Sequence, residues 1–216
     1  MTFAREAWVF VLPVALAAVA AFFLQWPKSA VGLAVAATLI LAFFRIPYRS
    51  FTGPEAVVLA PANGTITAIE TVDEPLVGEG PLTRVTTFLS VFNIHVQRAP
   101  AGGRVVESRF QRGRKIAAFR PEAGEVNESH LVVIETANGD RIGVKQIAGL
   151  LARRVVSYLE TAQEVDRGEL IGVIKFGSRV DLYLPPEWEL TVAEGDRVTE
   201  GLTPMARRPE DREPGT

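Results

Sequence analysis

Two uncharged apolar runs stand close together at the N-terminus, and they constrain the fold more than any other feature. The first covers residues 8–24 and the second covers residues 30–44, with only residues 25–29 between them. A helix needs about 20 apolar residues to span a bilayer, with a range of about 17–25. The first run reaches that range, and the second reaches it only with its flanks. The pattern predicts a membrane-associated helical hairpin over residues 1–45 that either crosses the bilayer twice or dips into it.

Basic residues flank both ends of the predicted hairpin. Arg5 precedes it, Arg45 and Arg49 follow it, and Lys28 lies in the turn. Since basic flanks favour the cytoplasmic side of a membrane, this bias places both ends and the rest of the chain in the cytoplasm. A cleaved signal peptide and a buried helical hairpin of a soluble protein are the two alternatives. The second apolar run, which would remain after signal cleavage, favours the membrane hairpin.

The remainder of the chain, residues 46–206, has the pattern of a β-rich domain. Short alternating or β-branched runs, punctuated by Gly, predict strands over residues 56–60, 64–71, 82–92, 103–110, 130–136, 141–147, 170–176, 179–184 and 189–192. Nine short strands at close spacing indicate a mainly β fold of the barrel or sandwich-hybrid kind. We expect the tail over residues 207–216, rich in Pro and charge, to be disordered.

Two local patterns stand out within this β-rich domain. Asn138, Gly139 and Asp140 lie between two predicted strands. Because Asn-Gly tolerates positive φ, they predict a β-hairpin with a tight primed turn. Residues 149–160 carry apolar side chains at helical spacing, with Arg153 and Arg154 off the apolar stripe. They predict the one helix of the domain.

Composition excludes several classes of function. The chain has no Cys, which excludes disulfides, a thiol nucleophile and thiolate metal sites. With only two His as well, we expect no metal centre. The formal net charge is −2, which gives no basic surface for a phosphate backbone. We therefore expect no nucleic-acid partner.

Two places in the β-rich domain could carry chemistry. His95 ends an apolar strand pattern beside Asn93 and Arg98, where an imidazole can act as a general acid or base or can serve the structure alone. Gly177 and Ser178 join two β-rich runs. Such a Gly usually marks a bulge or turn. Alternatively, the Ser hydroxyl attacks the preceding carbonyl and shifts the chain onto an ester. The spacing does not decide between these interpretations.

Three motifs together resemble the short, compact class of phosphatidylserine decarboxylase proenzymes of bacteria and archaea. FLSVFNIHVQRAP (residues 88–100) looks like the family's histidine motif, and VKQIAGLLARR (residues 144–154) looks like its central segment. IKFGSRVDLYLP (residues 174–185) looks like its self-cleavage motif, and FRIP (residues 44–47) follows the hydrophobic hairpin as Phe-Arg-Asp-Pro does in the family. The resemblance runs from about residue 15 to about residue 205, in the family's order.

The resemblance implies a pyruvoyl enzyme that decarboxylates phosphatidylserine. Ser178 would attack the Gly177 carbonyl, and elimination and hydrolysis would leave a covalent pyruvoyl group in place of Ser178. The products would be a β chain of residues 1–177 and an α chain of residues 178–216. The pyruvoyl group would serve as the electron sink, a role that pyridoxal phosphate plays elsewhere, so neither that cofactor nor a metal is expected. His95 would return a proton to the substrate.

The chain departs from the family pattern at two positions. Asn63, in APANG (residues 60–64), replaces the family's Asp, and Arg98 stands where the long bacterial class has a second His. The acid of a triad-like arrangement is therefore missing. An Asn can orient an imidazole but cannot offset its positive charge, so activation of Ser178 falls to His95 alone or to backbone strain at Gly177. Equally, Asn63 could simply form an Asn-Gly turn.

The implied partners are a phospholipid substrate, the membrane and the two chains of one precursor, with a homo-oligomer left open. Arg98, Lys175 and Arg179 are the motif-adjacent candidates for binding the headgroup phosphate. One rival hypothesis is a membrane-anchored carrier or adaptor module, because residues 195–201 resemble the end of a barrel-sandwich hybrid domain. The other is a serine peptidase that uses a Ser–Lys pair such as Ser90 with Lys145.

Overall fold

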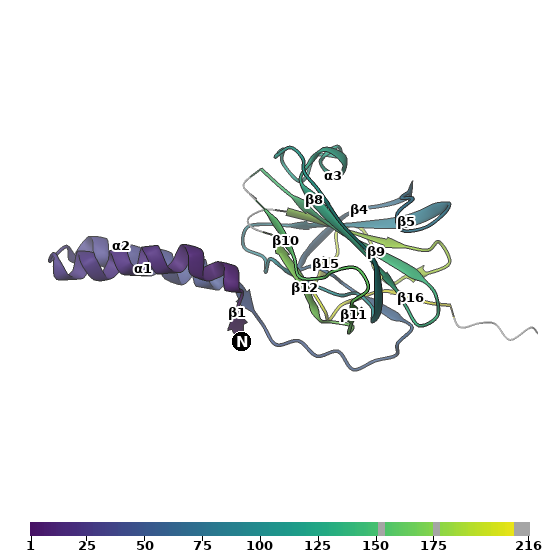
Figure 1. Ribbon diagram of the computed structural model, residues 1–216, viewed down its shortest axis with the longest axis horizontal. Coiled ribbons are helices and arrows are strands. Elements are labelled where there is room, and N and C mark those ends of the chain that lie inside the picture. The colour runs from purple at the N-terminus through teal and green to yellow at the C-terminus, as the bar shows by residue number, and fades with distance from the viewer. Residues whose placement is uncertain (151–153, 175–177, 210–216) are drawn as a thin grey trace, which may run out of the picture. The chain divides into compact units, whose positions relative to one another are not determined.

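The computed structural model describes residues 1–150, 154–174 and 178–209, and the chain separates into two compact units, Met1–Tyr48 and Arg49–Thr216. We describe each unit by itself. The first holds two long helices and a two-stranded sheet, and the second, here called the body, holds the larger sheets (Figure 1).

The N-terminal unit is an apolar helical hairpin. Its elements are β1 (Thr2–Phe3), the 3-10 helix η1 (Arg5–Ala7), α1 (Trp8–Phe23), α2 (Pro27–Phe43) and β2 (Arg45–Ile46). The turn between the helices places Gln25 at a φ of 58°, and Pro27 begins α2, where its missing N–H costs no hydrogen bond. Thr2 pairs with Ile46, which closes the base of the hairpin.

The outer surface of this hairpin is apolar. Phe22 and Phe23 are 70% and 78% exposed, and α2 buries none of its residues. The helical stretch Arg5–Phe23 is long and apolar enough to cross a membrane, whereas Pro27–Phe43 is shorter. The predicted hairpin is confirmed, and its exposed apolar side chains favour membrane association.

The body is built from antiparallel strands in three sheets. An eight-stranded sheet has the order β11-β7-β8-β9-β13-β5-β4-β15, and two three-stranded sheets have the orders β10-β12-β6 and β14-β16-β3. The strands are β3 (Val57–Leu59), β4 (Gly64–Asp73), β5 (Pro81–Leu89), β6 (Val96–Arg98), β7 (Gly103–Gln111), β8 (Ser129–Glu135), β9 (Arg141–Ala148), β10 (Val155–Ser157), β11 (Glu164–Val165), β12 (Leu170–Ile174), β13 (Ser178–Leu184), β14 (Glu189–Leu190), β15 (Arg197–Val198) and β16 (Pro204–Arg207). The mainly β prediction is confirmed.

All three sheets contribute to one apolar core. It includes Val180, Leu182 and Leu184 of the central strand β13, together with Ile174 of β12 and Met205 of β16. Because side chains alternate across a strand, the residues between these on β13 face the other side of the large sheet. There Tyr183 belongs to a second, smaller apolar cluster.

Two local predictions for the body are wrong. No helix forms over the described part of residues 149–160, where β10 pairs with β12 instead. Residues 151–153 of that prediction lie outside the described part of the chain. The predicted β8–β9 hairpin is confirmed, but Gly139 alone of its turn residues has a positive φ, of 82°. A primed turn of type I′ needs two such residues, so the turn is of another kind. One short helix, α3 (Ala123–Val126), was not predicted.

Candidate functional site

Ser178 is the first residue of β13, the strand between β9 and β5 in the large sheet. It lies opposite Leu89 on one side and Ala148 on the other, and it shares the core-facing side of β13 with Val180 and Leu182. Ser178 is fully buried, and its hydroxyl has no hydrogen-bond partner among the described residues. A buried polar group without a hydrogen-bond partner lowers stability by about 1–3 kcal/mol. A chemical role for the hydroxyl would explain why this residue is a serine.

His95 lies beside the same stretch of chain. Its carbonyl oxygen accepts a hydrogen bond of 3.1 Å from the backbone N–H of Ile174, the last residue of β12. Ser178 follows Ile174 by four residues, a reach of at most about 14 Å between Cα atoms. Gly177 and Lys175, both candidates from the sequence, lie between them and outside the described residues. His95 therefore contacts the residue that lies four positions before Ser178 in the chain.

The tautomer of the neutral His95 ring is set by its backbone neighbour. Nδ1 lies 2.9 Å from the carbonyl oxygen of Asn93, and His95 is fully buried. A carbonyl oxygen can only accept, so Nδ1 carries the hydrogen. In the neutral ring, Nε2 then holds a lone pair and can act as a base.

Asn63 is connected to His95 through Asn93. The Asn93 side chain donates from Nδ2 to Asn63 Oδ1 at 2.7 Å, and its own Oδ1 accepts from the backbone N–H and the hydroxyl of Ser90 at 2.8 and 2.7 Å. These bonds fix the turn whose carbonyl contacts the imidazole. Asn63 thus supports the residue that orients His95, which gives it more than a local turn role.

A pocket of about 570 Å³ opens beside this network. The described residues that line it include one basic residue and no acidic residue. They are Asn63, Gly64, Thr65, Phe88, Ser90, Asn93, Arg197, Val198 and Thr199. Arg197 was not predicted as a site residue. In the sequence, its segment, residues 195–201, resembles only the end of a barrel-sandwich hybrid domain.

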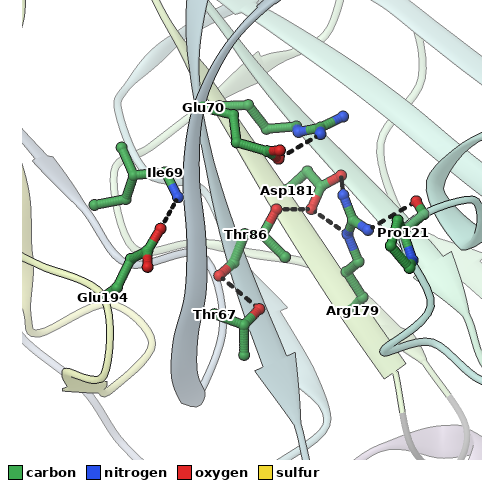
Figure 2. Close-up of polar contacts among 9 residues, drawn as sticks. Thr67, Ile69, Glu70, Thr86, Pro121, Arg179, Asp181 and Glu194 are labelled. Atoms are coloured by element: carbon green, nitrogen blue, oxygen red, sulfur yellow. Dashed lines mark hydrogen bonds and ion pairs between the residues drawn. The ribbon is translucent and has the colours of Figure 1, made fainter.

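Arg179 points away from Ser178, to the other side of β13. Its Nε and Nη2 lie 2.7 and 2.8 Å from the two carboxylate oxygens of Asp181, and Thr86 donates its hydroxyl to Asp181 at 3.0 Å (Figure 2). Pro121 accepts a longer bond of 3.5 Å from the guanidinium. Arg179 and Asp181 are both buried. Arg179, a candidate for phosphate binding, therefore lies in a buried ion pair with Asp181 that stabilises β13.

Arg98 occupies a second buried group of charges. Its Nη1 donates to the carbonyl oxygen of Gly168 at 2.7 Å. Burial lowers the pKa of Arg98, Glu200 acts in the opposite sense, and Arg49 lowers it further. Glu200 is itself fully buried, and its Oε1 lies 3.3 Å from Arg49 Nε. Arg98 therefore lies in a buried cluster of alternating charges.

The structure also places the residues of the rival hypotheses. The Ser90 hydroxyl donates to Asn93, whereas Lys145 Nζ lies 3.7 Å from Glu74 on another part of the sheet, so the two have separate partners. Among the residues described, no group of three or more His, Asp or Glu side chains is arranged to hold a metal ion.

His130, the second histidine, is part of β8. Its Nε2 lies 2.9 Å from the hydroxyl of Ser108, which itself donates to the carbonyl oxygen of Leu159 at 2.9 Å. The Ser108 hydroxyl donates its proton to the Leu159 carbonyl oxygen, so His130 Nε2 is the donor in the bond between His130 and Ser108. Burial lowers the pKa of His130. This histidine is a hydrogen-bonded structural residue, distant in sequence from the Ser178 motif.

Comparisons with known proteins agree on one family. The family model described as phosphatidylserine decarboxylase matches residues 36–206. A phosphatidylserine decarboxylase proenzyme of Symbiobacterium thermophilum is 39% identical over 207 residues, covering 96% of each chain. The proenzyme of Nocardia farcinica is 45% identical over 192 residues, which is 88% of this chain and 80% of that protein. The one of Wolbachia sp. subsp. Brugia malayi is 39% identical over 206 residues, or 94% and 89%.

Proposed function

Because the chain belongs to the phosphatidylserine decarboxylase family, we propose that it converts phosphatidylserine to phosphatidylethanolamine and carbon dioxide after cutting itself between Gly177 and Ser178. One observation carries the proposal for the site: the Ser178 hydroxyl is fully buried without a partner among the described residues. A reactive hydroxyl needs a free lone pair and a base, and we assign His95 Nε2 as that base.

The self-cleavage begins with proton transfer. His95 Nε2 takes the Ser178 hydroxyl proton as the oxygen attacks the Gly177 carbonyl carbon. The proton is then returned to the Ser178 nitrogen as the C–N bond breaks, which leaves an ester and a free amine. Loss of the Ser178 α-proton then expels the Gly177 carboxylate and leaves dehydroalanine. This enamine tautomerises to an imine, which takes up water and releases ammonia and so leaves a ketone at the new N-terminus. Every step uses water and the chain's own groups.

The residues present fit a covalent pyruvoyl group at position 178. The Ser178 hydroxyl, buried at the first residue of a central strand, makes no hydrogen bond with a described residue that its conversion to a ketone would break. When present, this group supplies the electron sink for the electrons that carbon dioxide leaves behind. His95, fully buried and held by Asn93, then returns a proton to the substrate carbon through Nε2.

The cut chain is expected to stay assembled. The α chain of residues 178–216 contains β13, β15 and β16, which pair with β5 and β9, with β4, and with β3 respectively. All of these partners belong to the β chain of residues 1–177. Strand pairing and the shared core therefore hold the two chains together after the peptide bond between them is broken.

We propose that substrate binding involves the membrane and the pocket beside Asn63, whose lining includes neither Ser178 nor His95. Arg197 is the described cation that lines this pocket, and we assign it to the headgroup phosphate ahead of Arg98 and Arg179, which are engaged in buried charge clusters. Lys175 remains a candidate. Residues 1–45 would tether the catalytic domain, residues 46–206, on the cytoplasmic face, where a surface-bound enzyme meets its lipid at high effective concentration.

A single comparison tests the proposal. Purified full-length protein and a Ser178→Ala variant are run on a denaturing gel, and carbon dioxide release from phosphatidylserine is measured in mixed micelles. We expect two chains and activity from the first, and one chain and no activity from the second. An intact chain with full activity would contradict the pyruvoyl mechanism, and two chains from Ser178→Ala would contradict the role of the hydroxyl.

A further inference from the structure

Large apolar side chains are exposed on the body in an uneven way. Among its described residues they are Val91, Phe92, Phe110, Phe119 and Leu150. Phe92 is 87% exposed, Phe119 74% and Leu150 65%. Single exposed apolar residues are normal on a protein surface, but a cluster of them marks an interaction site.

Strand register puts these side chains at the end of the body that holds Ser178. Leu89 and Ala148 are the two residues opposite Ser178. Val91 and Phe92 follow Leu89 by two and three residues in the next turn, and Leu150 follows Ala148 by two residues. The exposed side chains of both flanking strands therefore lie just beyond the reactive strand end.

The segment over residues 112–122 brings Phe119 to the same end. Asn127 holds it by bonds to the backbone N–H and carbonyl of Ile116 at 3.0 and 2.9 Å, and by a third bond to the carbonyl of Ala148 at 2.7 Å. Figure 1 shows α3, which follows this segment, at one end of the body, away from β11 and β16. Phe110 is the last but one residue of strand β7 and lies opposite His130.

The same segment is strongly basic. Over residues 109–120 the exposed charged side chains are all basic, and exposed Glu122 and Glu125 follow them; the five basic residues are Arg109, Arg112, Arg114, Lys115 and Arg120. The whole chain carries −2, so this density of positive charge is local. Exposed aromatic side chains set among Lys and Arg are typical of surfaces that bind at a lipid interface and favour anionic headgroups.

We propose that this end of the body is a docking face for a bilayer that contains anionic lipid. The docking face comprises residues 91–92, 109–120 and 150. Its apolar side chains would enter the interface while its cations meet the headgroups, in addition to any contact made by the N-terminal hairpin. The reason for docking at this end rests on the proposed function, because it would bring Ser178 to a substrate that stays in the bilayer.

Site-specific labels can test the docking face in the full chain, since the protein has no Cys of its own. Single Cys residues at Phe92 and Phe119 carry an environment-sensitive fluorophore. The matched control is Asn138, an exposed residue in the β8–β9 turn. This turn follows Glu135, six residues and about 20 Å along β8 from Ser129 at the Ser178 end. The proteins are reconstituted into vesicles of phosphatidylcholine with or without phosphatidylglycerol, which contain spin-labelled lipid as a quencher.

We expect quenching roughly threefold stronger at 92 and 119 than at 138 in the anionic vesicles, because the quencher acts over a range shorter than the ~20 Å between the ends. Raising salt from about 0.1 M to about 1 M should reduce it, since the Debye length falls from ~10 to ~3 Å. An Arg112→Gln, Arg114→Gln and Lys115→Gln variant should lose most of the quenching at 119. Equal quenching at 119 and 138 would overturn the proposal. Quenching that is reduced neither by added salt nor by this variant would overturn it as well.

Self-cleavage and carbon dioxide release are measured on the same samples. Quenched labels on a chain that neither cleaves nor decarboxylates would overturn the proposed function and support the docking face. Unquenched labels on a cleaved, active enzyme would overturn the docking face alone. A partner protein as the true occupant predicts no quenching at 92 or 119 in vesicles, which also overturns the proposal.

Discussion

The buried pair of Arg179 and Asp181 makes a sharp prediction about the stability of β13. Asp181→Asn keeps the size of the side chain and an acceptor for the Thr86 hydroxyl, but it removes the charge that faces the guanidinium (Figure 2). Arg179 and Asp181 are 7% and 0% exposed in their side chains, so solvent cannot replace the lost partner. We expect the free energy of unfolding to fall by about 3–5 kcal/mol.

The magnitude follows from the contacts. Removing one partner of a buried pair leaves an uncompensated charge, whereas replacing both with apolar groups is often neutral. Arg179→Met with Asp181→Leu should therefore cost clearly less than the sum of the single changes. The matched control is Arg84→Met on the same face of the sheet. Arg84 Nη2 lies 2.6 Å from Glu70 Oε2, but that carboxylate is 51% exposed, so we expect a loss of only about 0–1 kcal/mol.

The assay is urea unfolding of full-length protein in detergent, in a Ser178→Ala background that keeps one chain. With Trp8→Phe and Trp26→Phe in place, the buried Trp188 reports on the body alone. If Asp181→Asn unfolds within about 1 kcal/mol of the reference and the double variant shows no coupling, the stabilising role of the pair is refuted.

Three further predictions concern the site and pH. Arg197→Ala should raise KM for phosphatidylserine about tenfold with self-cleavage unchanged, because one charge-assisted hydrogen bond is lost, and an unchanged KM would exclude Arg197 from the pocket's function. Asn63→Asp should speed self-cleavage at Ser178 by about tenfold, since it keeps an acceptor and adds a negative charge near the imidazole, whereas slower cleavage on a gel time course would contradict this role. Burial lowers the pKa of His130 in the folded state, so unfolding takes up a proton and stability falls as pH drops below the unfolded pKa of about 6.5. His130→Gln, which can still donate to Ser108, should flatten the dependence of the urea midpoint on pH below about 6.5, and an unaltered slope would count against this origin.

Sequence patterns predicted the strands of the body where alternation was long enough. All nine predicted stretches contain a strand within the described residues, and β13 shows the expected alternation, with Val180, Leu182 and Leu184 in the core. The two-residue strands β11 and β15 carry too little pattern to be recognised alone. The helix predicted over residues 149–160 failed because Val155 and Val156 pair with Ile174 and Val173, and pairing with a neighbouring strand outweighs local spacing.

The residue types of the candidate site could be predicted from the sequence, but their hydrogen bonds and spatial neighbours could not. His95 and Ser178 stand out in the sequence, but the role of Asn93 depends on its backbone carbonyl, which no side-chain pattern encodes. Arg179 and Ser178 are neighbours in sequence, yet strand alternation sends their side chains to opposite faces. Arg197 approaches the pocket only because β15 pairs with β4 at Thr65.

The mass of the smaller chain tests the central claim most directly. Intact-mass analysis of the denatured wild-type protein should give a fragment of residues 178–216 that is lighter than its seryl form by one ammonia and that gains two hydrogens on borohydride reduction. This result would establish a ketone at position 178. A fragment with a free N-terminal Ser, or a single chain of 23.5 kDa, would contradict the account.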